Sequence, residues 1–232
     1  ELTINKKSQE IDKIISELPN GTADIIIGGP PCQGFSLTGT RNKEDKRNRL
    51  FYSAFDLAKE ISPKAIIIEN VPGIVNLYDG MAKSEIYRMA KKLGYTCTHK
   101  ELYAPDYGVP QIRKRVFFVA LRKDLGTFEF PMPTHTAKNY VTCEHAISDL
   151  PSLNNGLGSD HTSYDTKPES DYQKKMRSMS YEINNHIGTK HTEHVISVIS
   201  QVPEGGNHKD LPPGVGESRK FNEAWTRYHS KK

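Results

Sequence analysis

One stretch near the N-terminus limits the possible folds of this 232-residue chain more than any other. Residues 25–27 are three consecutive isoleucines, which predict a short strand buried on both faces of a sheet. Two glycines end that strand, and Pro30 and Pro31 then fix the backbone and offer no N–H donors. The sequence therefore predicts a stiff turn that presents a single thiol, Cys32, directly after a buried strand.

A second buried strand is predicted over residues 65–70, whose sequence is Ala-Ile-Ile-Ile-Glu-Asn. Between the two strands, residues 50–61 place apolar side chains at helical spacing. A strand, a helix and a strand in this order form a right-handed crossover between parallel strands. Cys32 and Glu69 are therefore expected in the crevice where open α/β sheets bind their ligands. The predicted fold class is α/β, with a doubly wound and mostly parallel sheet.

A pair of arginines is expected to reach the same crevice. The other elements predicted in this half are a helix over residues 8–18, a helix over 80–93, a strand over 95–103 and a buried strand over 111–120. At the start of the last strand, Gln111, Arg113 and Arg115 alternate with two other residues. The three polar side chains are therefore expected to project to one side.

The three side-chain types together suggest one chemistry. A cysteine is a nucleophile as its thiolate, which neighbouring arginines favour by lowering the pKa of the thiol. A carboxylate accepts hydrogen bonds from amino and ring N–H groups, and a guanidinium donates to a carbonyl or a phosphate. These preferences match the edge of a cytosine base. Each residue alone is more often structural than catalytic, but their joint occurrence at successive strand ends favours a catalytic site.

The charge distribution fits a polyanionic partner. The formal net charge is +4, and residues 1–129 hold 20 Lys and Arg against 16 Asp and Glu, whereas residues 130–232 hold 12 against 12. The basic excess therefore lies in the part that contains Cys32, although such an excess alone is a weak signal. The basic run over residues 37–49 fits a solvated connector and a nucleic-acid-binding loop equally well.

A change of composition near residue 130 predicts a domain boundary. Residues 130–232 are rich in Pro, Ser and Asn and hold eight of the nine histidines. Helices are predicted over residues 144–150 and 191–202, and the remainder is expected to be loop-like. Three of these histidines have loosely metal-like spacing, but no accompanying Cys or carboxylate pattern exists, so we expect no metal site. They are His186, His191 and His194.

The cysteine count and the hydropathy pattern indicate the compartment. The three cysteines are widely spaced and form no Cys-x-x-Cys pair, so the sequence predicts neither a disulfide framework nor a zinc site. No apolar run reaches the length of a membrane span, and the charged start lacks the apolar core of a secretory signal. We therefore expect a cytoplasmic protein with no membrane partner.

Three motifs resemble those of the DNA cytosine-5 methyltransferases, in the order that this family has them. Residues 29–36 (Gly-Pro-Pro-Cys-Gln-Gly-Phe-Ser) resemble the nucleophile motif, residues 69–73 (Glu-Asn-Val-Pro-Gly) the glutamate motif, and residues 111–115 the Gln-x-Arg-x-Arg motif. Residues 45–50 resemble the intervening Asp-x-Arg-x-x-Leu segment. The resemblance is to the bacterial restriction-modification type. Looser matches lie at residues 133–135, 146–151 and 203–207.

The resemblance implies a Rossmann-like methyltransferase core and a mechanism. Cys32 would attack carbon 6 of a cytosine flipped out of double-stranded DNA, Glu69 would bind its ring nitrogen and amine, and Arg113 and Arg115 would hold its carbonyl. Carbon 5 would then take a methyl group from S-adenosylmethionine. The resemblance also implies cofactor contacts for Pro30, Gln33 and Leu50. It implies contacts to DNA or the base for Gln33, Ser36, Arg41, Arg47, Asn70 and Gln111.

The match is incomplete at both ends. The family's Phe-x-Gly-x-Gly cofactor loop, its acidic ribose-binding residue and its late Arg-rich motifs have no counterpart in this sequence. We therefore expect the sheet to lack its first strands and this chain alone to lack the full cofactor site. A second chain is one possible source of the missing motifs. Residues 1–129 are then a partial catalytic core, and residues 130–232 lead into or form part of a target-recognition region.

Three alternatives stay open from the sequence. The chain could be an inactive or partner-dependent DNA-binding fragment whose Cys32 is a relic. It could also be an RNA cytosine methyltransferase, although the Gly-Phe-Ser end of the Cys32 turn is more similar to the DNA enzymes. A thiol oxidoreductase is disfavoured because no resolving cysteine accompanies Cys32.

Overall fold

The computed structural model describes residues 4–30, 51–76, 79–153, 157–203, 206 and 208–216. The chain divides into two compact units, Glu1–Ala104 with Ile112–Pro133, and Pro105–Gln111 with Thr134–Lys232. The assignment of residues 1–129 to a catalytic core and of 130–232 to a recognition region stays a prediction.

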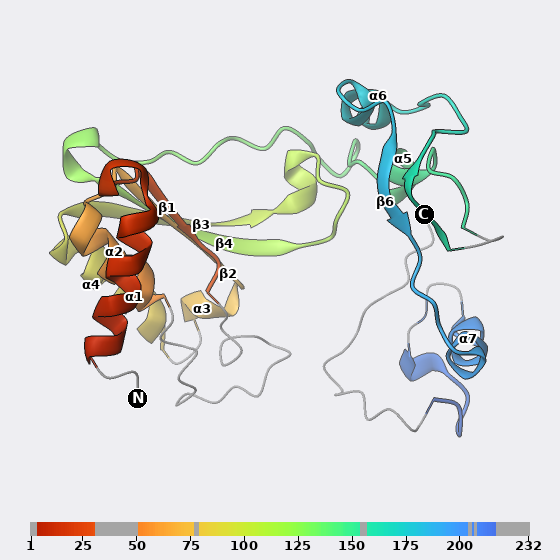
Figure 1. Ribbon diagram of the computed structural model, residues 1–232, viewed down its shortest axis with the longest axis horizontal. Coiled ribbons are helices and arrows are strands. Elements are labelled where there is room, and N and C mark those ends of the chain that lie inside the picture. Colours follow the sequence, from red (N-terminus) through yellow and green to blue (C-terminus); the bar gives the residue numbers. More distant parts are fainter. Residues whose placement is uncertain are drawn as a thin grey trace. The chain divides into compact units, whose positions relative to one another are not determined.

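The elements of both units are shown in Figure 1. The α-helices are α1 (Ile4–Glu17), α2 (Tyr52–Ile61), α3 (Gly73–Asn76), α4 (Met81–Lys92), α5 (Cys143–Ile147), α6 (Asp171–Arg177) and α7 (Glu193–Ser200). The strands are β1 (Ile25–Gly28), β2 (Ala65–Asn70), β3 (Tyr95–Tyr103), β4 (Lys114–Arg122), β5 (Gly158–Thr162) and β6 (Ile183–Ile187). Short 3₁₀ turns are Pro19–Gly21, Ala104–Tyr107, Lys123–Leu125 and His208–Asp210.

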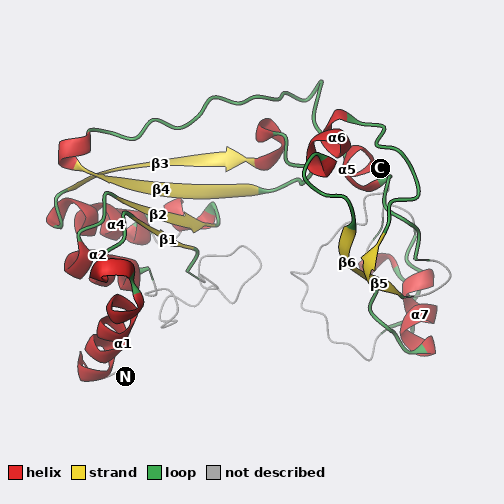
Figure 2. Cartoon of the chain, turned by 45° about the horizontal axis from the view of Figure 1, so that its top comes forward, coloured by secondary structure: helices red, strands yellow, loops and turns green. Residues whose placement is uncertain are grey.

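The first unit is built on one sheet with the strand order β1-β2-β4-β3 (Figure 2). Strands β1 and β2 are parallel, as the strand-helix-strand order predicts, with Gly28 opposite Ile68. Strand β4 lies between β2 and β3 and is antiparallel to both. The α/β fold class is confirmed. Strands β1 and β2 terminate at the same end of the sheet, and β4 begins at that end.

The core of this unit lies between the sheet and its helices. Alternate residues of β2 and β4 point to one face, where Ile66, Ile68 and Phe118 pack against Phe55 of α2 and Ile86 of α4. Each of these side chains is at most 1% exposed. Burial of a side chain of this size contributes about 1.5–3 kcal/mol relative to exposure, so this face holds β1, β2 and β4 in register.

The prediction that β1 is buried on both faces is wrong for the described part of the chain. Ile26 is buried, but Ile25 and Ile27 are 52% and 74% exposed. The physical reason is position, because β1 has β2 as its one neighbour among the described strands and lies at the edge of the sheet. Its three isoleucines are typical of a central strand.

The second unit is organised around polar contacts. Its β5 and β6 form a two-stranded antiparallel ribbon, and α5 contacts α6. Gln173 of α6 is buried; its amide nitrogen donates to Ser148 Oγ (2.9 Å) and its amide oxygen accepts from the backbone N–H of Glu169 (2.7 Å). The buried Asp149 carboxylate pairs with Arg177 (3.1 Å). The helices predicted over 144–150 and 191–202 are confirmed as α5 and α7, whereas α6, β5 and β6 were not predicted.

Candidate active site

Glu69 and Arg115 form the central contact of the candidate site. Glu69 is the penultimate residue of β2 and lies opposite Phe117 of β4. Arg115 is two residues before Phe117, hence on the same face of β4. Its Nε atom is 2.8 Å from Glu69 Oε1, and both side chains are partly exposed. Such a pair is partly screened by solvent, so its main effect is to orient the carboxylate and the guanidinium.

The nucleophile turn begins beside this pair. A Cβ atom on Gly29 would lie 3.5 Å from Glu69 Oε2, so the backbone that leads into Pro30 passes close to the carboxylate. Pro30 is the last described residue before Cys32. The position of Gly28 and Gly29 relative to Glu69 therefore follows from the parallel pairing of β1 and β2.

Asn70 ties the ends of the two strands together. Its side-chain amide nitrogen donates to the carbonyl oxygen of Pro30 (3.2 Å), and its amide oxygen accepts from the backbone N–H of Val71 (2.8 Å). Asn70 is 3% exposed. The proposed contact of Asn70 with DNA stays a prediction; the geometry gives this amide a positioning role that the sequence did not indicate.

Arg113 and Gln111 lie outside the strand in which they were predicted. Strand β4 begins at Lys114, so the strand alternation applies to Arg115 alone. The backbone N–H of Gln111 donates to Val109 (2.8 Å), which turns the chain, and the carbonyl of Arg113 accepts from Ala104 (2.8 Å). The expectation that all three side chains project to one face of a strand is therefore wrong, because a turn precedes the strand. Both side chains are exposed.

Six of the predicted site residues belong to the segment between Pro30 and Phe51. They lie outside the described residues and are Cys32, Gln33, Ser36, Arg41, Arg47 and Leu50. Their catalytic, cofactor and DNA roles stay predictions, as do the roles of Pro30, Glu69, Gln111, Arg113 and Arg115.

The loop before Gln111 is held by residues that the sequence did not single out as a group. The carbonyl of Asp106 accepts from the backbone N–H groups of Thr134 and His135, both at 2.9 Å. The hydroxyl of Tyr140 donates to Asp106 Oδ1 at 2.6 Å. Gly108 has a φ of +75°, and a Cβ there would lie 2.7 Å from the His135 ring. The Pro-Thr-His run at 133–135 was the sequence feature that could have indicated this contact. Its hydrogen bonds to Asp106 and its approach to Gly108 give the run a structural role.

A cavity of about 470 Å³ opens beside Pro30 at the edge of β1. Its walls are mainly apolar and come from α1, β1 and α2, with Ile14, Pro30 and Phe51 among them. Glu10 supplies the one carboxylate of this lining. The residues present fit a flat apolar group such as an adenine ring, and they offer few partners for ribose hydroxyls or an amino acid.

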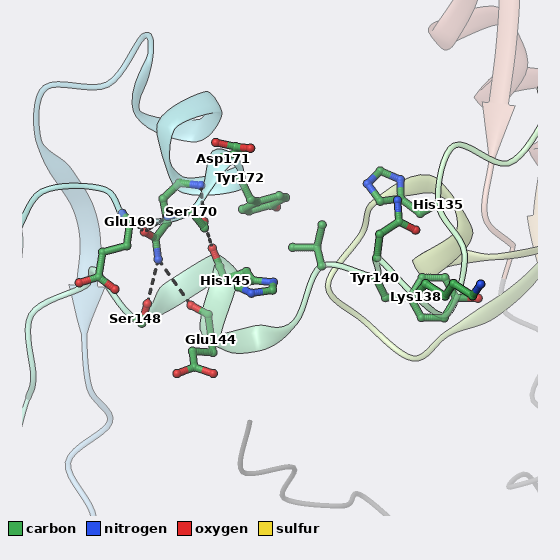
Figure 3. A pocket seen from close by; sticks show the side chains of 13 residues that line it. His135, Lys138, Tyr140, Glu144, His145, Ser148, Glu169, Ser170, Asp171 and Tyr172 are labelled. Carbon is green, nitrogen blue, oxygen red and sulfur yellow. Dashed lines mark hydrogen bonds between the residues drawn. The ribbon is translucent and has the colours of Figure 1, made fainter.

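A larger cavity, about 740 Å³, belongs to the second unit (Figure 3). His135, Lys138 and Tyr140 line one part, and residues in or next to α5 and α6 line most of the rest. Glu144, Glu169 and Asp171 outnumber the single lysine in the lining, so the cavity is poorly suited to a phosphate group.

The comparison with protein families decides the relationship of the chain. A family model described as C-5 cytosine-specific DNA methylase matches residues 2–228. The chain belongs to this family. Membership confirms the resemblance that the three motifs carry.

Curated methylase relatives match most of this chain. It is 38% identical over 194 residues to the Type II methyltransferase M.DdeI of Desulfomicrobium norvegicum. The aligned region covers 81% of this chain and 47% of that protein. It is 34% identical over 228 residues to M1.HphI of Haemophilus parahaemolyticus, with coverages of 95% and 54%. The chain thus spans about half the length of these relatives. The comparisons give no support for a second chain.

A solved structure shows the same fold. A protein described as a DNA modification methyltransferase encoded within a prophage of E. coli superposes with a TM-score of 0.62 at 24% identity. The match covers 89% of this chain and 64% of the other. At this identity the likeness concerns the fold of the methylase and nothing further.

Two further findings concern the described ranges only. None of their helices is long and apolar enough to cross a membrane. Within the same ranges, no three His, Cys, Asp or Glu residues are grouped so that they could hold a metal ion.

Proposed function

We propose that this chain carries the residues that bind and activate the target base in a DNA cytosine-5 methyltransferase. The observation that carries the proposal is the Glu69–Arg115 ion pair at the carboxyl end of β2, beside the turn that leads from β1 to Cys32. The carboxylate of Glu69, a hydrogen-bond acceptor, and the guanidinium of Arg115 thus lie near Gly29, the first residue of the nucleophile motif. Family membership supplies the reaction class.

In the proposed mechanism, Cys32 attacks carbon 6 of an extruded cytosine as the thiolate and forms an S–C bond. The Glu69 carboxyl group binds ring nitrogen N3 and the exocyclic amine, and this favours a proton at N3. Arg115 orients Glu69 and donates to the base carbonyl, with Arg113 beside it on the preceding loop. Electron density then reaches carbon 5, which becomes nucleophilic.

S-adenosylmethionine would supply the electrophilic methyl group, and its sulfur would leave as the neutral thioether S-adenosylhomocysteine. Of the described residues, Pro30 and Phe51 would hold its apolar part in the cavity beside β1. Gln33 and Leu50 are proposed to complete that side of the site. After carbon 5 is methylated, a base removes its proton and the bond to Cys32 breaks, which regenerates the thiolate.

The partner proposed for this site is double-stranded DNA, and the setting is a bacterial restriction-modification system in the cytoplasm. The names of the Type II relatives support this proposal. The basic residues Arg41 and Arg47 would contact phosphates, and Ser36 and Gln111 would contact the nucleotide near the extruded base.

A cofactor-independent assay tests the proposal. Attack by Cys32 on carbon 6 labilises the hydrogen at carbon 5, so DNA that contains [5-³H]cytosine should release tritium into water. The same assay with tRNA separates the RNA methyltransferase alternative. Binding of DNA with no tritium release and no effect of Cys32→Ala would favour a DNA-binding fragment instead.

A further inference from the structure

A further cavity, of about 410 Å³, lies in the first unit between α4 and the start of β3, both labelled in Figure 2. At this end of the sheet, Tyr95 of β3 is opposite Arg122, the last residue of β4. Arg122 is seven residues after Arg115, which is roughly 23 Å at the rise of an extended strand. The cavity is therefore remote from the Glu69–Arg115 pair of the candidate active site.

The cavity is lined by three cationic side chains from two parts of the fold. Arg88 and Lys91 belong to α4, and Lys123 begins the 3₁₀ turn that follows β4. None of the described residues that line this cavity is an Asp or a Glu. A concave site with positive charges and no compensating acid in its lining attracts an anion.

Two carboxylates follow lining residues directly in the sequence, and both are already paired with arginines. Glu85 accepts from Nε and Nη2 of Arg88, at 2.7 and 2.6 Å. Asp124 accepts from Nε and Nη2 of Arg122, at 2.7 and 2.9 Å. Each carboxylate therefore has a guanidinium partner of its own. These bonds use one side of the Arg88 guanidinium and leave its Nη1 atom able to donate to a ligand.

Lys91 and Lys123 form no ion pair with the described residues. Both side chains are exposed. A lysine in the last turn of a helix compensates the helix dipole, and this is sufficient reason for Lys91 at the end of α4. It does not explain Lys123, which comes from another element. The backbone N–H of Lys123 donates to the carbonyl of Gly94 (3.1 Å), and this bond holds the turn against the chain that leaves α4.

The inner side of the cavity is aromatic and apolar. The Tyr95 hydroxyl donates to the carbonyl of Pro63 (2.6 Å), and the Tyr87 hydroxyl hydrogen-bonds Nδ1 of His99 (2.7 Å). The polar ends of both tyrosines are therefore satisfied by the protein. Burial raises the pKa of the Cys97 thiol to about 12, so this lining sulfur is neutral and packs as an apolar group. These three residues thus offer apolar surface to an occupant.

A flat ring that carries a phosphate group matches both parts of this lining. Phosphate oxygens accept hydrogen bonds from ammonium and guanidinium groups. Aromatic rings pack against tyrosine rings in offset or edge-to-face arrangements. A free nucleotide has a ring and a phosphate in one molecule, and cavities of a few hundred Å³ bind ligands of this size. Duplex DNA fits less well, because its bases are stacked inside the helix and no ring is available to the cavity.

We propose that the cavity between α4 and β3 binds a free nucleotide. Lys91, Lys123 and Arg88 hold its phosphate. The rings of Tyr87 and Tyr95 contact its base. The site uses none of the residues assigned to the target base or to S-adenosylmethionine, so this inference is independent of the proposed function.

Isothermal titration calorimetry of the full chain with thymidine 5′-monophosphate tests the site. Thymine is chosen because it is neither the base of the proposed cofactor nor the target base. One nucleotide should bind per chain. Thymidine alone and inorganic phosphate alone should each bind at least about 10-fold more weakly, because each lacks one set of contacts.

A charge-removing variant and a matched control assign the binding to the cavity. Lys91→Gln with Lys123→Gln should weaken binding of thymidine 5′-monophosphate by about 10-fold or more, because two hydrogen bonds to a charged group are lost. The same variant should bind thymidine as the unmodified chain does. Lys13→Gln with Lys59→Gln removes two exposed lysines of α1 and α2, which are not among the residues that line the cavity. This control should bind the nucleotide with unchanged affinity.

The NMR signal of the His99 ring gives a second, local measurement. Because the Tyr87 hydroxyl is bonded to this imidazole, a nucleotide against Tyr87 should shift the His99 ring signal. The ring of His194, in the second unit, should keep its signal and serves as the reference.

Three results would overturn the inference. The first is the absence of binding heat and of a His99 shift with thymidine 5′-monophosphate. The second is an equal loss of affinity in the cavity variant and in the control. The third is displacement of the nucleotide by a 30-base-pair duplex, since the cavity would then bind the phosphates of DNA. None of these measurements uses methyl transfer or tritium release, so a failure of the proposed function would leave them unchanged.

Discussion

Arg115 and Glu69 are diagonal neighbours on two antiparallel strands, and their side chains form an ion pair with an Nε to Oε1 distance of 2.8 Å. The pair forms because β4 begins where β2 ends, so two residues 46 positions apart in the sequence meet at one end of the sheet. Because Gly29 lies against the same carboxylate, this contact links the glutamate motif, the arginine motif and the start of the nucleophile turn.

Replacement of Glu69 by glutamine should slow tritium release and methyl transfer by about 10²-fold or more, because a carboxyl group that favours a proton at N3 is lost. The measurement is the initial rate with [5-³H]cytosine DNA. Glu101→Gln is the matched control. Glu101 is an exposed carboxylate of β3, and its Oε1 atom lies 3.2 Å from Nζ of Lys114 on β4. Equal rates for Glu69→Gln and the unmodified chain would remove the role of Glu69.

Replacement of Asn70 by alanine should lower the free energy of unfolding by about 1–3 kcal/mol, because the Pro30 carbonyl and the Val71 N–H lose buried partners. Urea denaturation measures this change. The exposed Asn76 provides the control, and Asn76→Ala should change the free energy by less than about 0.5 kcal/mol. If Asn70→Ala were as stable as the control, the two hydrogen bonds would not hold the strand ends together.

Gly108→Ala should destabilise the chain more than Gly94→Ala. Both glycines have positive φ, +75° and +86°, so each substitution strains the backbone by about 1–2 kcal/mol. Only at Gly108 would the new methyl group collide, since the His135 ring lies 2.7 Å away, whereas nothing lies within 4 Å at Gly94. Thermal unfolding of both variants, and of Gly108→Ala with His135→Ala, separates the two effects. A double variant no more stable than Gly108→Ala would contradict the contact.

Stability should fall at alkaline pH in a way that depends on Cys97. Burial raises the pKa of the Cys97 thiol from 9.0 to about 12. The unfolded chain therefore loses this proton near pH 9 while the folded chain keeps it. The contribution of Cys97 to the free energy of unfolding is complete below pH 9. It is lost as the pH rises towards 12, by at most about 1.4 kcal/mol per pH unit.

Urea denaturation at pH 8.0 and 9.8 checks this expectation, with Cys97→Ala as the comparison. The unmodified chain should lose more stability over this interval than the variant. The interval ends below pH 10 because the pKa values of Tyr87 and Tyr95 are also raised from 10.0, chiefly by burial. An equal loss in both proteins would contradict a buried neutral thiol.

The sequence predicted the parts of the fold in which one pattern dominates. Isoleucine runs predicted β1 and β2, helical spacing predicted α2 and α4, and these elements lie where expected. The exposure of Ile27 could not be predicted, because a strand's own residues do not state how many neighbours it has. The place of β4 between β2 and β3 is also a tertiary property that alternation does not encode.

The second unit was harder to predict because its core is polar. Ser170 and Gln173 form a capping box that begins α6, and the Ser-x-x-Gln spacing was a signal for that helix. The ribbon strands carry Ser, Asp, His and Asn, so no apolar alternation marked them. The sequence predicted that Glu69 and Arg115 lie in one crevice, whereas their ion pair and the contacts of Asn70 and Asp106 required the geometry.

The most direct test of the proposed chemistry is tritium release from duplex DNA with [5-³H]cytosine, without a methyl donor. The unmodified chain should release tritium at a rate proportional to its concentration, and Cys32→Ala should release none above background. Cys32→Ala is the informative variant because the proposed attack forms a bond to its sulfur. Equal release by both proteins, or release by neither while DNA is bound, would contradict the assignment of Cys32 as the nucleophile.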